Sequence, residues 1–308
     1  MKKIFSIILP IYNNEKNLSV TIPYILDKIK VLENRYKIEI IMVCDGSPDN
    51  SYAVMKKYQK EYPHIIKIAK FLKNSGQRAA VNCGMSLAKG DVIGVISADL
   101  QDPFELFFEM LEFWENGEKL VIAARENRKD KGLGPLMSNL LHKIIHNNIN
   151  SNYPIGGFDF FLVDKSITEP FIKSDTKNNS MQLLLLDIVG SAKVIYYTRQ
   201  ERKIGKSGWN LKKRINQVLN IFAIYTDLPF RLSLILSFFL IFIGLCLSIF
   251  ALLNTDNGLI IGLYALVCIF FGFVIFIISF LSLYLFKWME NEKRNPRYVL
   301  SDVVIDDE

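Results

Sequence analysis

The chain has 308 residues and a formal net charge of +6, with 22% charged and 50% hydrophobic residues. The charge is modest and no long basic stripe with interleaved aromatic residues is present, so nucleic acid is not an expected partner. The four cysteines form no CxxC pair, which argues against a structural zinc site and indicates a reducing compartment.

Five short runs rich in β-branched residues alternate with amphipathic stretches in the N-terminal part of the chain. They span residues 4–9, 38–44, 65–69, 92–97 and 120–124. This alternation predicts an α/β fold in which a mostly parallel sheet is covered by helices on both faces. The first run follows two lysines, but Pro10 and Asn13 interrupt it too early for a signal peptide, and no small-residue cleavage site follows. A first β-strand is the better interpretation.

Polar side chains and turn residues follow three of these runs directly. They are Pro10, Tyr12, Asn13 and Glu15 after the first run, Asp45, Gly46, Ser47 and Asp49 after the second, and Asp99, Gln101 and Asp102 after the fourth. Ligands of open α/β sheets bind outside the carboxyl ends of the strands. We therefore expect these three strand ends to converge on one cleft.

Two common nucleotide-binding motifs are absent from the sequence. No GxGxxG follows a predicted strand, and the triplet Gly205, Lys206 and Ser207 has Gln200 where a P-loop needs glycine. The carboxylates at the strand ends are suited to hold a divalent cation against a diphosphate, because hard oxygen ligands favour Mg²⁺ or Mn²⁺.

Two further segments have helical periodicity. His142 and His146 have the i, i+4 spacing of a zinc-binding pair, but no HExxH pattern accompanies them. Residues 133–149 are better explained as an amphipathic helix at the bilayer surface. Residues 209–225 combine apolar side chains with a basic cluster at 212–214. They predict an interfacial helix that would bring the site close to a lipid phosphate.

Two long apolar runs, residues 232–253 and 259–286, contain no charged residue. Each exceeds the roughly 20 residues needed to cross the hydrocarbon core of a bilayer, and a buried core helix is the alternative. We expect two transmembrane helices and therefore three regions: a head of residues 1–226 that includes the juxtamembrane helix, an anchor of residues 227–286 and a C-terminal tail of residues 287–308.

Lysine and arginine side chains flank the two apolar runs on their outer sides, whereas the loop between them carries only Asp256 as a charged residue. Because positively charged flanks tend to remain in the cytoplasm, the head and the tail should both be cytoplasmic. The expected location is the inner membrane. Residues 294–300 end in apolar side chains, and the sequence leaves open whether this tail docks or lies free.

Three segments of the head carry recognisable motifs: residues 8–15 (ILPIYNNE), 43–49 (VCDGSPD) and 98–103 (ADLQDP). Together they resemble the family 2 inverting glycosyltransferases. With the two terminal helices, the chain is most similar to the polyprenyl-phosphate branch, which includes dolichol-phosphate mannose synthases and bactoprenol glucosyltransferases. The similarity continues through Arg125, Arg128, residues 157–164 and residues 199–209. It implies a GT-A-type domain that binds a nucleotide sugar.

The resemblance implies that Asp45 contacts the nucleotide base. The other residues expected at the nucleotide sugar are Pro10, Tyr12, Glu15, Arg78 and Ala98. Arg78 lies in segment 76–80, where a helix N-terminus would present N–H groups to an anion. Taken singly, Asp45 could belong to a common turn, Asp49 could cap the following helix, and Arg78 could be an exposed helix-face side chain.

The metal site is also implied by the resemblance. The family commonly uses an Asp-x-Asp pair and a glutamine two positions later, which places Asp99 and Gln101 as ligands of Mg²⁺ or Mn²⁺. Ser97 stands at the first aspartate position and removes one charged ligand. Either Asp99 and the diphosphate hold the ion with water, or the affinity for metal is weakened.

A polyprenyl phosphate is already ionised near neutral pH, so its enzyme needs positioning and cations more than a strong base. By resemblance, these cationic residues bind the lipid phosphate and the donor diphosphate: Arg125, Arg128, Arg199 and Lys206 are expected at the acceptor phosphate, and the catalytic residues are Asp159, Asp99 and Arg202. Asp159 would orient the sugar hydroxyls or the acceptor, although Phe161 stands where the family often has arginine. Solvated surface charges and a turn at Asp159 are the alternatives.

We therefore expect an inverting transferase that moves a sugar from a nucleotide diphosphate sugar to undecaprenyl or dolichyl phosphate at the cytoplasmic membrane face. A transferase acting on another lipid-linked acceptor is one alternative. Processive synthesis is disfavoured, because two helices offer little material for a channel and no QxxRW pattern is present. A catalytically silent nucleotide-sugar-binding membrane protein is the alternative from another class. The sequence leaves the oligomeric state open, a homo-oligomer included.

Overall fold

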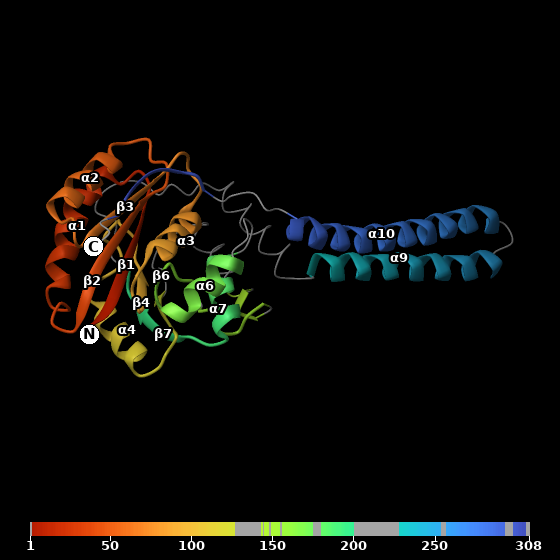
Figure 1. The fold of residues 1–308 in the computed structure, drawn as a ribbon. Coiled ribbons are helices and arrows are strands. Elements are labelled where there is room, and N and C mark those ends of the chain that lie inside the picture. Colours follow the sequence, from red (N-terminus) through yellow and green to blue (C-terminus); the bar gives the residue numbers. More distant parts are fainter. Residues whose placement is uncertain are drawn as a thin grey trace. The chain divides into compact units, whose positions relative to one another are not determined.

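A computed structural model describes residues 2–126, 143, 145–147, 149–154, 156–174, 180–199, 228–253, 257–292 and 298–305 (Figure 1). The predicted interfacial helix of residues 209–225 and the site residues Arg128, Arg202 and Lys206 lie outside these ranges, as does most of segment 133–149. The chain divides into two compact units, one of Met1–Arg214 with Pro296–Glu308 and one of Ile215–Asn295. The finer division into three regions stays a prediction.

Within the described residues, the first unit contains an eight-stranded sheet with the order β7-β5-β6-β4-β1-β2-β3-β8. The strands are β1 Lys3–Ile11, β2 Tyr36–Cys44, β3 Ile66–Phe71, β4 Val92–Val95, β5 Leu120–Arg125, β6 Phe160–Asp164, β7 Lys193–Tyr197 and β8 Leu300–Val304. β1 pairs in parallel with β2 and β4, and β2–β3 and β5–β7 are also parallel. Only β6 and β8 run antiparallel to their neighbours among these strands. The predicted mostly parallel α/β fold is confirmed.

Helices cover both faces of this sheet (Figure 1). One face carries α1 (Glu15–Ile29), α2 (Ser51–Glu61) and α4 (Leu106–Glu115), and α3 (Gln77–Leu87) packs on the other beside α6 (Lys165–Ser174), which contacts α7 (Met181–Val189). β1 is buried on both faces: Phe5 meets Phe107 of α4 edge-on at 5.2 Å, whereas Ile8 faces Gly84 of α3. This explains why β1 is a continuous apolar run.

The C-terminal strand β8 belongs to this sheet and pairs with the outer edge of β3. The ring of Tyr298 stacks on Phe71 with 4.6 Å between the centroids, and Leu72 donates its N–H to the carbonyl of Val299 at 2.9 Å. Asp302 accepts a hydrogen bond from the Tyr52 hydroxyl at 2.6 Å and pairs with a lysine of α2. The described end of the tail therefore docks on the head of its own chain and covers a strand edge that would otherwise be open.

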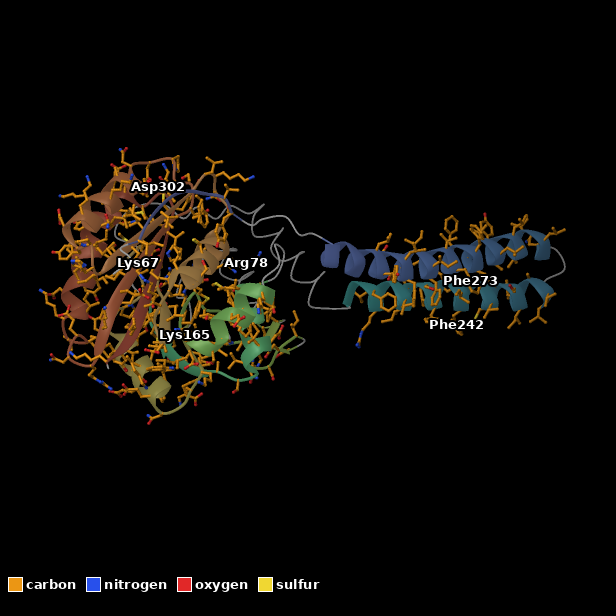
Figure 2. The ribbon with its side chains drawn as sticks, in the orientation of Figure 1. Lys67, Arg78, Lys165, Phe242, Phe273 and Asp302 are labelled. Carbon is orange, nitrogen blue, oxygen red and sulfur yellow. The ribbon has the colours of Figure 1, made fainter. Side chains whose placement is uncertain are left out.

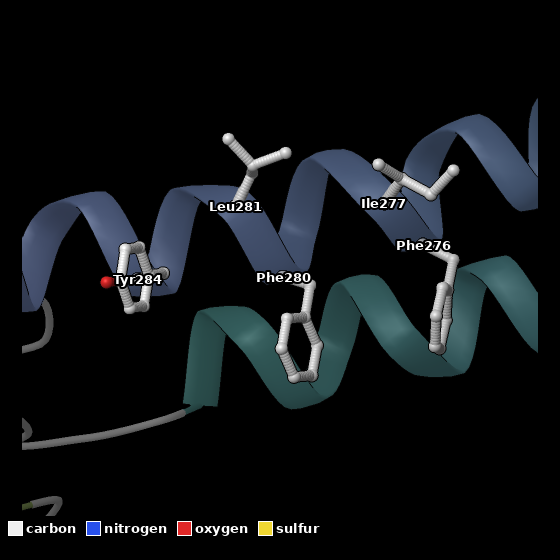
Figure 3. A pocket seen from close by; sticks show the side chains of 5 residues that line it. All are labelled: Phe276, Ile277, Phe280, Leu281 and Tyr284. Atoms are coloured by element: carbon white, nitrogen blue, oxygen red, sulfur yellow. The ribbon is translucent and has the colours of Figure 1, made fainter.

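The described part of the second unit consists of α9 (Leu228–Leu253) and α10 (Gly258–Glu292), which contact each other along their length. Glycines permit the contact: a Cβ atom at Gly244 would lie 2.5 Å from Ile269 Cγ1, and one at Gly272 would lie 2.6 Å from Ile241 Cγ1. At one end, two phenylalanines of α10 lie against α9, where Phe280 meets Phe230 with 6.0 Å between the centroids (Figure 3).

Both helices are candidate membrane spans, Phe230–Leu253 and Gly258–Ser282. Only 11% of the most apolar window of each is buried, so these helices are not the buried core of a soluble unit. Most of their large apolar side chains, including Phe242 and Phe273, are exposed (Figure 2). Apolar surface of this extent is suited to lipid.

Tyr298→Ala tests the attachment of the tail. The substitution removes the ring that stacks on Phe71, so we expect the melting temperature of the full-length protein in detergent to fall by about 3–6 °C. Differential scanning fluorimetry measures this shift. Val299→Ala is the matched control, because that side chain is exposed, and it should change the melting temperature by less than about 1 °C. Equal melting temperatures for both variants would contradict the docking described above.

Candidate functional site

The sheet places three of the predicted strand ends at one edge. β1 lies between β2 and β4, and Ile11 is in register with Cys44, the last residue of β2. Asp45 then donates its N–H to the carbonyl of Ile11 at 2.8 Å, and Ile96, just after β4, donates to the carbonyl of Ile8 at 3.1 Å. The loops that follow β1, β2 and β4 therefore leave the sheet side by side.

Asp45 is buried, and its carboxylate accepts hydrogen bonds from the N–H groups of Ser75 at 2.6 Å and Gly76 at 2.8 Å. Burial raises the pKa of Asp45, and these two N–H groups offset part of the rise. Gly46 has φ of +57°, and a Cβ atom there would lie 2.3 Å from the backbone of Lys73. The DGS turn thus requires glycine so that the loop after β2 can approach the loop after β3.

The loop after β1 is joined to the loop after β2. Asn13 has a positive φ of 54° and donates its N–H to Ser47 Oγ at 2.6 Å. Glu15 donates its N–H to Asp49 at 3.0 Å, and its carboxylate accepts from the backbone N–H of Asn50 at 3.2 Å. Asp49 also accepts from the N–H of Ser51, the first residue of α2, at 3.1 Å, whereas the N-cap residue itself is Asn50. Burial alone would raise the pKa of Asp49, but the hydrogen bonds, led by those of Ser47 and Ser51, outweigh it and lower the pKa.

The remaining residues expected at the nucleotide sugar lie around these loops. Pro10 is the penultimate residue of β1, Tyr12 is exposed just after it, and Arg78 lies in the first turn of α3. Ala98 is buried, and its carbonyl accepts a hydrogen bond from Thr21 Oγ1 at 2.9 Å. Glu15 is engaged in joining two loops, and its expected contact with the nucleotide sugar stays a prediction.

Asp99 lies in the loop after β4 and is held on both oxygens. Ser97 Oγ and the N–H of Gln101 donate to its Oδ1 at 2.8 and 3.2 Å, and the guanidinium of Arg199 lies 3.6 Å from its Oδ2. No group of three or more His, Cys, Asp or Glu side chains that could hold a metal occurs among the described residues. A carboxylate and an amide oxygen fit a hard cation that also takes oxygens from a bound diphosphate. They do not form a complete metal site by themselves.

A second set of charged residues adjoins Asp99. Arg125, at the end of β5, pairs with Asp159 at 2.9 Å, and their side chains are 10% and 34% exposed. Gln182 of α7 donates to the other oxygen of Asp159 at 3.1 Å. Burial would lower the pKa of Arg125, but the negative charges of Asp159 and Asp102 outweigh it and raise the pKa above its ordinary value. Arg125 therefore stays cationic.

Asp102 and Tyr197 are members of this set that the sequence analysis gave no role. Asp102 Oδ1 accepts a hydrogen bond from the Tyr197 hydroxyl and another from Arg199 Nε at 3.2 Å. Burial raises the pKa of Asp102, and the charge of Arg199 offsets part of that rise. Tyr197 ends β7 and is in register with Arg125. The motif after β4 marked Asp102, but no local signal marked Tyr197.

Phe161 lies outside the site. It belongs to β6, is in register with Ile122 and is fully buried, with its ring edge-on to Phe158 at 6.1 Å. The position where the family often has arginine is therefore a core position in this chain. His146, the described member of the histidine pair, hydrogen-bonds the carbonyl of Tyr153 at 2.8 Å.

A mostly parallel α/β sheet with carboxylates and arginines at the carboxyl ends of its strands is the arrangement of GT-A-like glycosyltransferases. Residues 6–171, more than half of the chain, match the family described as Glycosyl transferase family 2. The chain belongs to this family, as its motifs predicted.

Relatives match nearly the whole chain. An "Uncharacterized glycosyltransferase YkcC" of Bacillus subtilis (strain 168) is 28% identical, with 96% of this chain and 93% of that protein covered. An "Undecaprenyl-phosphate 4-deoxy-4-formamido-L-arabinose transferase" of Photorhabdus laumondii is 26% identical, with coverage of 99% and 95%. The second name agrees with the predicted resemblance to the polyprenyl-phosphate branch.

A solved structure shares the fold of the first unit. It is the mannosyltransferase PcManGT from Pyrobaculum calidifontis in complex with GDP-Man and Mn²⁺, with a TM-score of 0.52 and 14% identity over 72% of this chain and 64% of that chain. At this identity the likeness concerns the fold.

Asp159→Asn tests the partly buried ion pair between Arg125 and Asp159. It leaves Arg125 without its nearest charged partner, although Asp102 still faces it, so we expect the free energy of unfolding to fall by about 1–2 kcal/mol. Chemical denaturation of the full-length protein in detergent measures the change. Lys173→Gln is the matched control, because the Lys173–Glu169 pair at 2.6 Å is largely exposed, and it should change stability by less than about 0.5 kcal/mol. If Asp159→Asn lowers the free energy of unfolding no more than the control does, the Arg125–Asp159 pair contributes nothing to stability.

Proposed function

We propose that this chain transfers a sugar, with inversion, from a nucleotide diphosphate sugar to a polyprenyl phosphate. The observation that carries the proposal is that Asp99 lies beside the partly buried Arg199 at the carboxyl edge of the sheet, where Arg125 pairs with Asp159. An acidic group suits a cation bound to the donor diphosphate, and the arginines suit the phosphate groups of the donor and of an anionic acceptor. The full-length relative named for undecaprenyl phosphate supports the choice of acceptor.

In this proposal the donor base lies beside Asp45. The carboxylate is already ordered by Ser75 and Gly76 N–H groups, and Gly46 lets the loops after β2 and β3 approach each other. Pro10 and Tyr12 border the pocket and Ala98 supports the sugar end. The ordered loops reduce the entropy lost when the nucleotide binds.

The diphosphate end of the donor lies at Asp99 and Gln101, which would hold Mg²⁺ or Mn²⁺ jointly with phosphate oxygens. The ion would offset negative charge that develops on the leaving diphosphate. Because Ser97 replaces a carboxylate and Asp99 already interacts with Arg199, we expect the ion to bind mainly together with the donor.

The acceptor phosphate requires orientation and cations. Arg125 remains cationic and is fixed by Asp159, so it can meet an ionised phosphate without reorganising. Asp159, held in turn by Gln182, has an oxygen placed to orient sugar hydroxyls or the acceptor. Arg128, Arg202 and Lys206 keep their predicted roles as further phosphate-binding or catalytic residues, outside the described ranges.

A catalytically silent binding protein is the second candidate, favoured by one observation. Ser97 stands in the metal motif, and Arg199 lies beside the only aspartate of that motif. Such a protein would bind a nucleotide sugar but transfer nothing. A transferase for a different lipid-linked acceptor would show turnover only with that acceptor.

The decisive experiment offers purified protein in detergent a panel of radiolabelled uridine and guanosine diphosphate sugars with undecaprenyl phosphate and Mg²⁺ or Mn²⁺. We expect label in the organic phase, lost with chelator and reduced about 100-fold or more in Asp99→Asn. Asp91→Asn, at the opposite end of β4, is the matched control. Donor binding without any labelled lipid would support the catalytically silent binding protein. Label that appears only on another lipid carrier would show that this carrier, and not undecaprenyl phosphate, is the acceptor.

We also propose that the head and the tail lie on the cytoplasmic side, with α9 and α10 crossing the inner membrane as a hairpin. β8 pairs with β3, so the segments before α9 and after α10 share one side of the membrane. Two candidate spans between them satisfy this requirement, and the basic flanks favour the cytoplasm.

Cysteine labelling tests this topology. In a Cys246→Ala, Cys268→Ala background, the remaining Cys44 and Cys83 are buried. We expect a membrane-impermeant maleimide to label Asn257→Cys in intact spheroplasts, and to label Ser301→Cys only after the membrane is opened, because both positions are exposed. Labelling of Ser301→Cys in intact spheroplasts would overturn the orientation.

A further inference from the structure

Asp102 is a buried carboxylate that the proposed function leaves without a role. Its side chain is 0% exposed, it follows Gln101 directly, and Oδ2 has no hydrogen-bond partner among the residues that the structure describes. Burial of a carboxylate opposes stability unless partners compensate it. Both contacts of Asp102 Oδ1 are made with β7 and the residues just after it, through Tyr197 and Arg199.

The guanidinium of Arg199 bridges two carboxylates. Its Nε donates to Asp102 Oδ1 at 3.2 Å, and a terminal nitrogen lies 3.6 Å from Asp99 Oδ2. The side chain of Arg199 is 26% exposed, whereas that of Asp102 is closed to solvent. One edge of the guanidinium is therefore anchored in the protein while the other faces Asp99 at the site.

This anchoring fixes the position of the Arg199 guanidinium. A long arginine side chain loses considerable rotamer entropy when it is fixed, and a bridging guanidinium needs two acceptors at a defined separation. Asp102 supplies the buried acceptor, and the Tyr197 hydroxyl orients the same carboxylate oxygen. Arg199 consequently adds a positive charge beside Asp99, in a motif where Ser97 has removed a negative one.

We propose that Asp102 is a positioning residue that holds Arg199 at Asp99, so that Arg199 serves the donor diphosphate and not the acceptor phosphate. The inference rests on the proposed function, because it assumes that a nucleotide diphosphate binds at Asp99. It narrows the role that the resemblance implies for Arg199 to the donor diphosphate alone. It also gives Asp102 and Tyr197 a common purpose, the orientation of one guanidinium.

A double-mutant cycle on nucleotide binding tests the proposal. Asp102→Asn, Arg199→Gln and the double variant are prepared in the full-length protein, and binding of UDP and of GDP with Mn²⁺ is measured by calorimetry. We expect each single variant to weaken binding of the preferred nucleotide about tenfold. The double variant should bind within about twofold of Arg199→Gln, because Asp102 acts through Arg199.

The proposal would be overturned if the affinity losses of the two single variants multiplied in the double variant. Unchanged nucleotide binding in Asp102→Asn would also overturn it. Arg35→Gln is the matched control: Arg35 pairs with Glu115 on the surface and should leave nucleotide binding unchanged. If Asp102→Asn does not fold, Arg199→Lys tests the same bridge, because one ammonium cannot replace a guanidinium fork between two carboxylates. Wild-type binding in Arg199→Lys would then count against it.

These outcomes separate the two proposals. Nucleotide binding by wild-type protein without sugar transfer would refute the proposed function, and the cycle would still be measurable. Sugar transfer with a cycle that shows independent effects would keep the proposed function and refute the role of Asp102.

Discussion

The position of β1 between β2 and β4 is the constraint on which the site depends. Parallel pairing on both sides of β1 sends three loops out of the same edge of the sheet. Such a strand must be apolar on both faces, and Phe5, Ile7 and Ile8 are all fully buried. A polar residue in this run is acceptable only with partners, as Ser6 has in the buried Glu39 and in the N–H of Gly90 at 2.9 Å.

Opposite charges fix the site before any substrate binds. Arg125 with Asp159, and Arg199 with Asp99 and Asp102, hold cations and carboxylates in a partly buried edge of the sheet. In the proposed function, such a site does not need to reorganise in order to bind a phosphate, because the protein has already ordered its dipoles and charges during folding. The same arrangement has an energetic cost, since each buried charge depends on its partner.

Local patterns explain what the sequence could predict. The first five strands are apolar runs followed by turn residues, and the DGS and ADLQDP segments stand where ligands of such sheets bind. β6, β7 and β8 were not predicted. β7 and β8 are short and only partly buried, and β6 adjoins a Gly-rich segment. The bridge of Arg199 to Asp102 joins residues 97 positions apart, and no periodicity encodes a contact of that separation.

β8 shows how a distant segment completes a local structure. Its partner β3 leads through Leu72 into the loop that carries Ser75 and Gly76, the two N–H donors of Asp45. Leu72 itself donates its N–H to the carbonyl of Val299 at 2.9 Å. β8 follows both apolar helices in the sequence. The edge strand β3 therefore gains its partner only from the part of the chain beyond α10. The tail thus fixes the end of β3 from which the loop that orders Asp45 departs, and this couples completion of the fold to the order of the proposed base pocket.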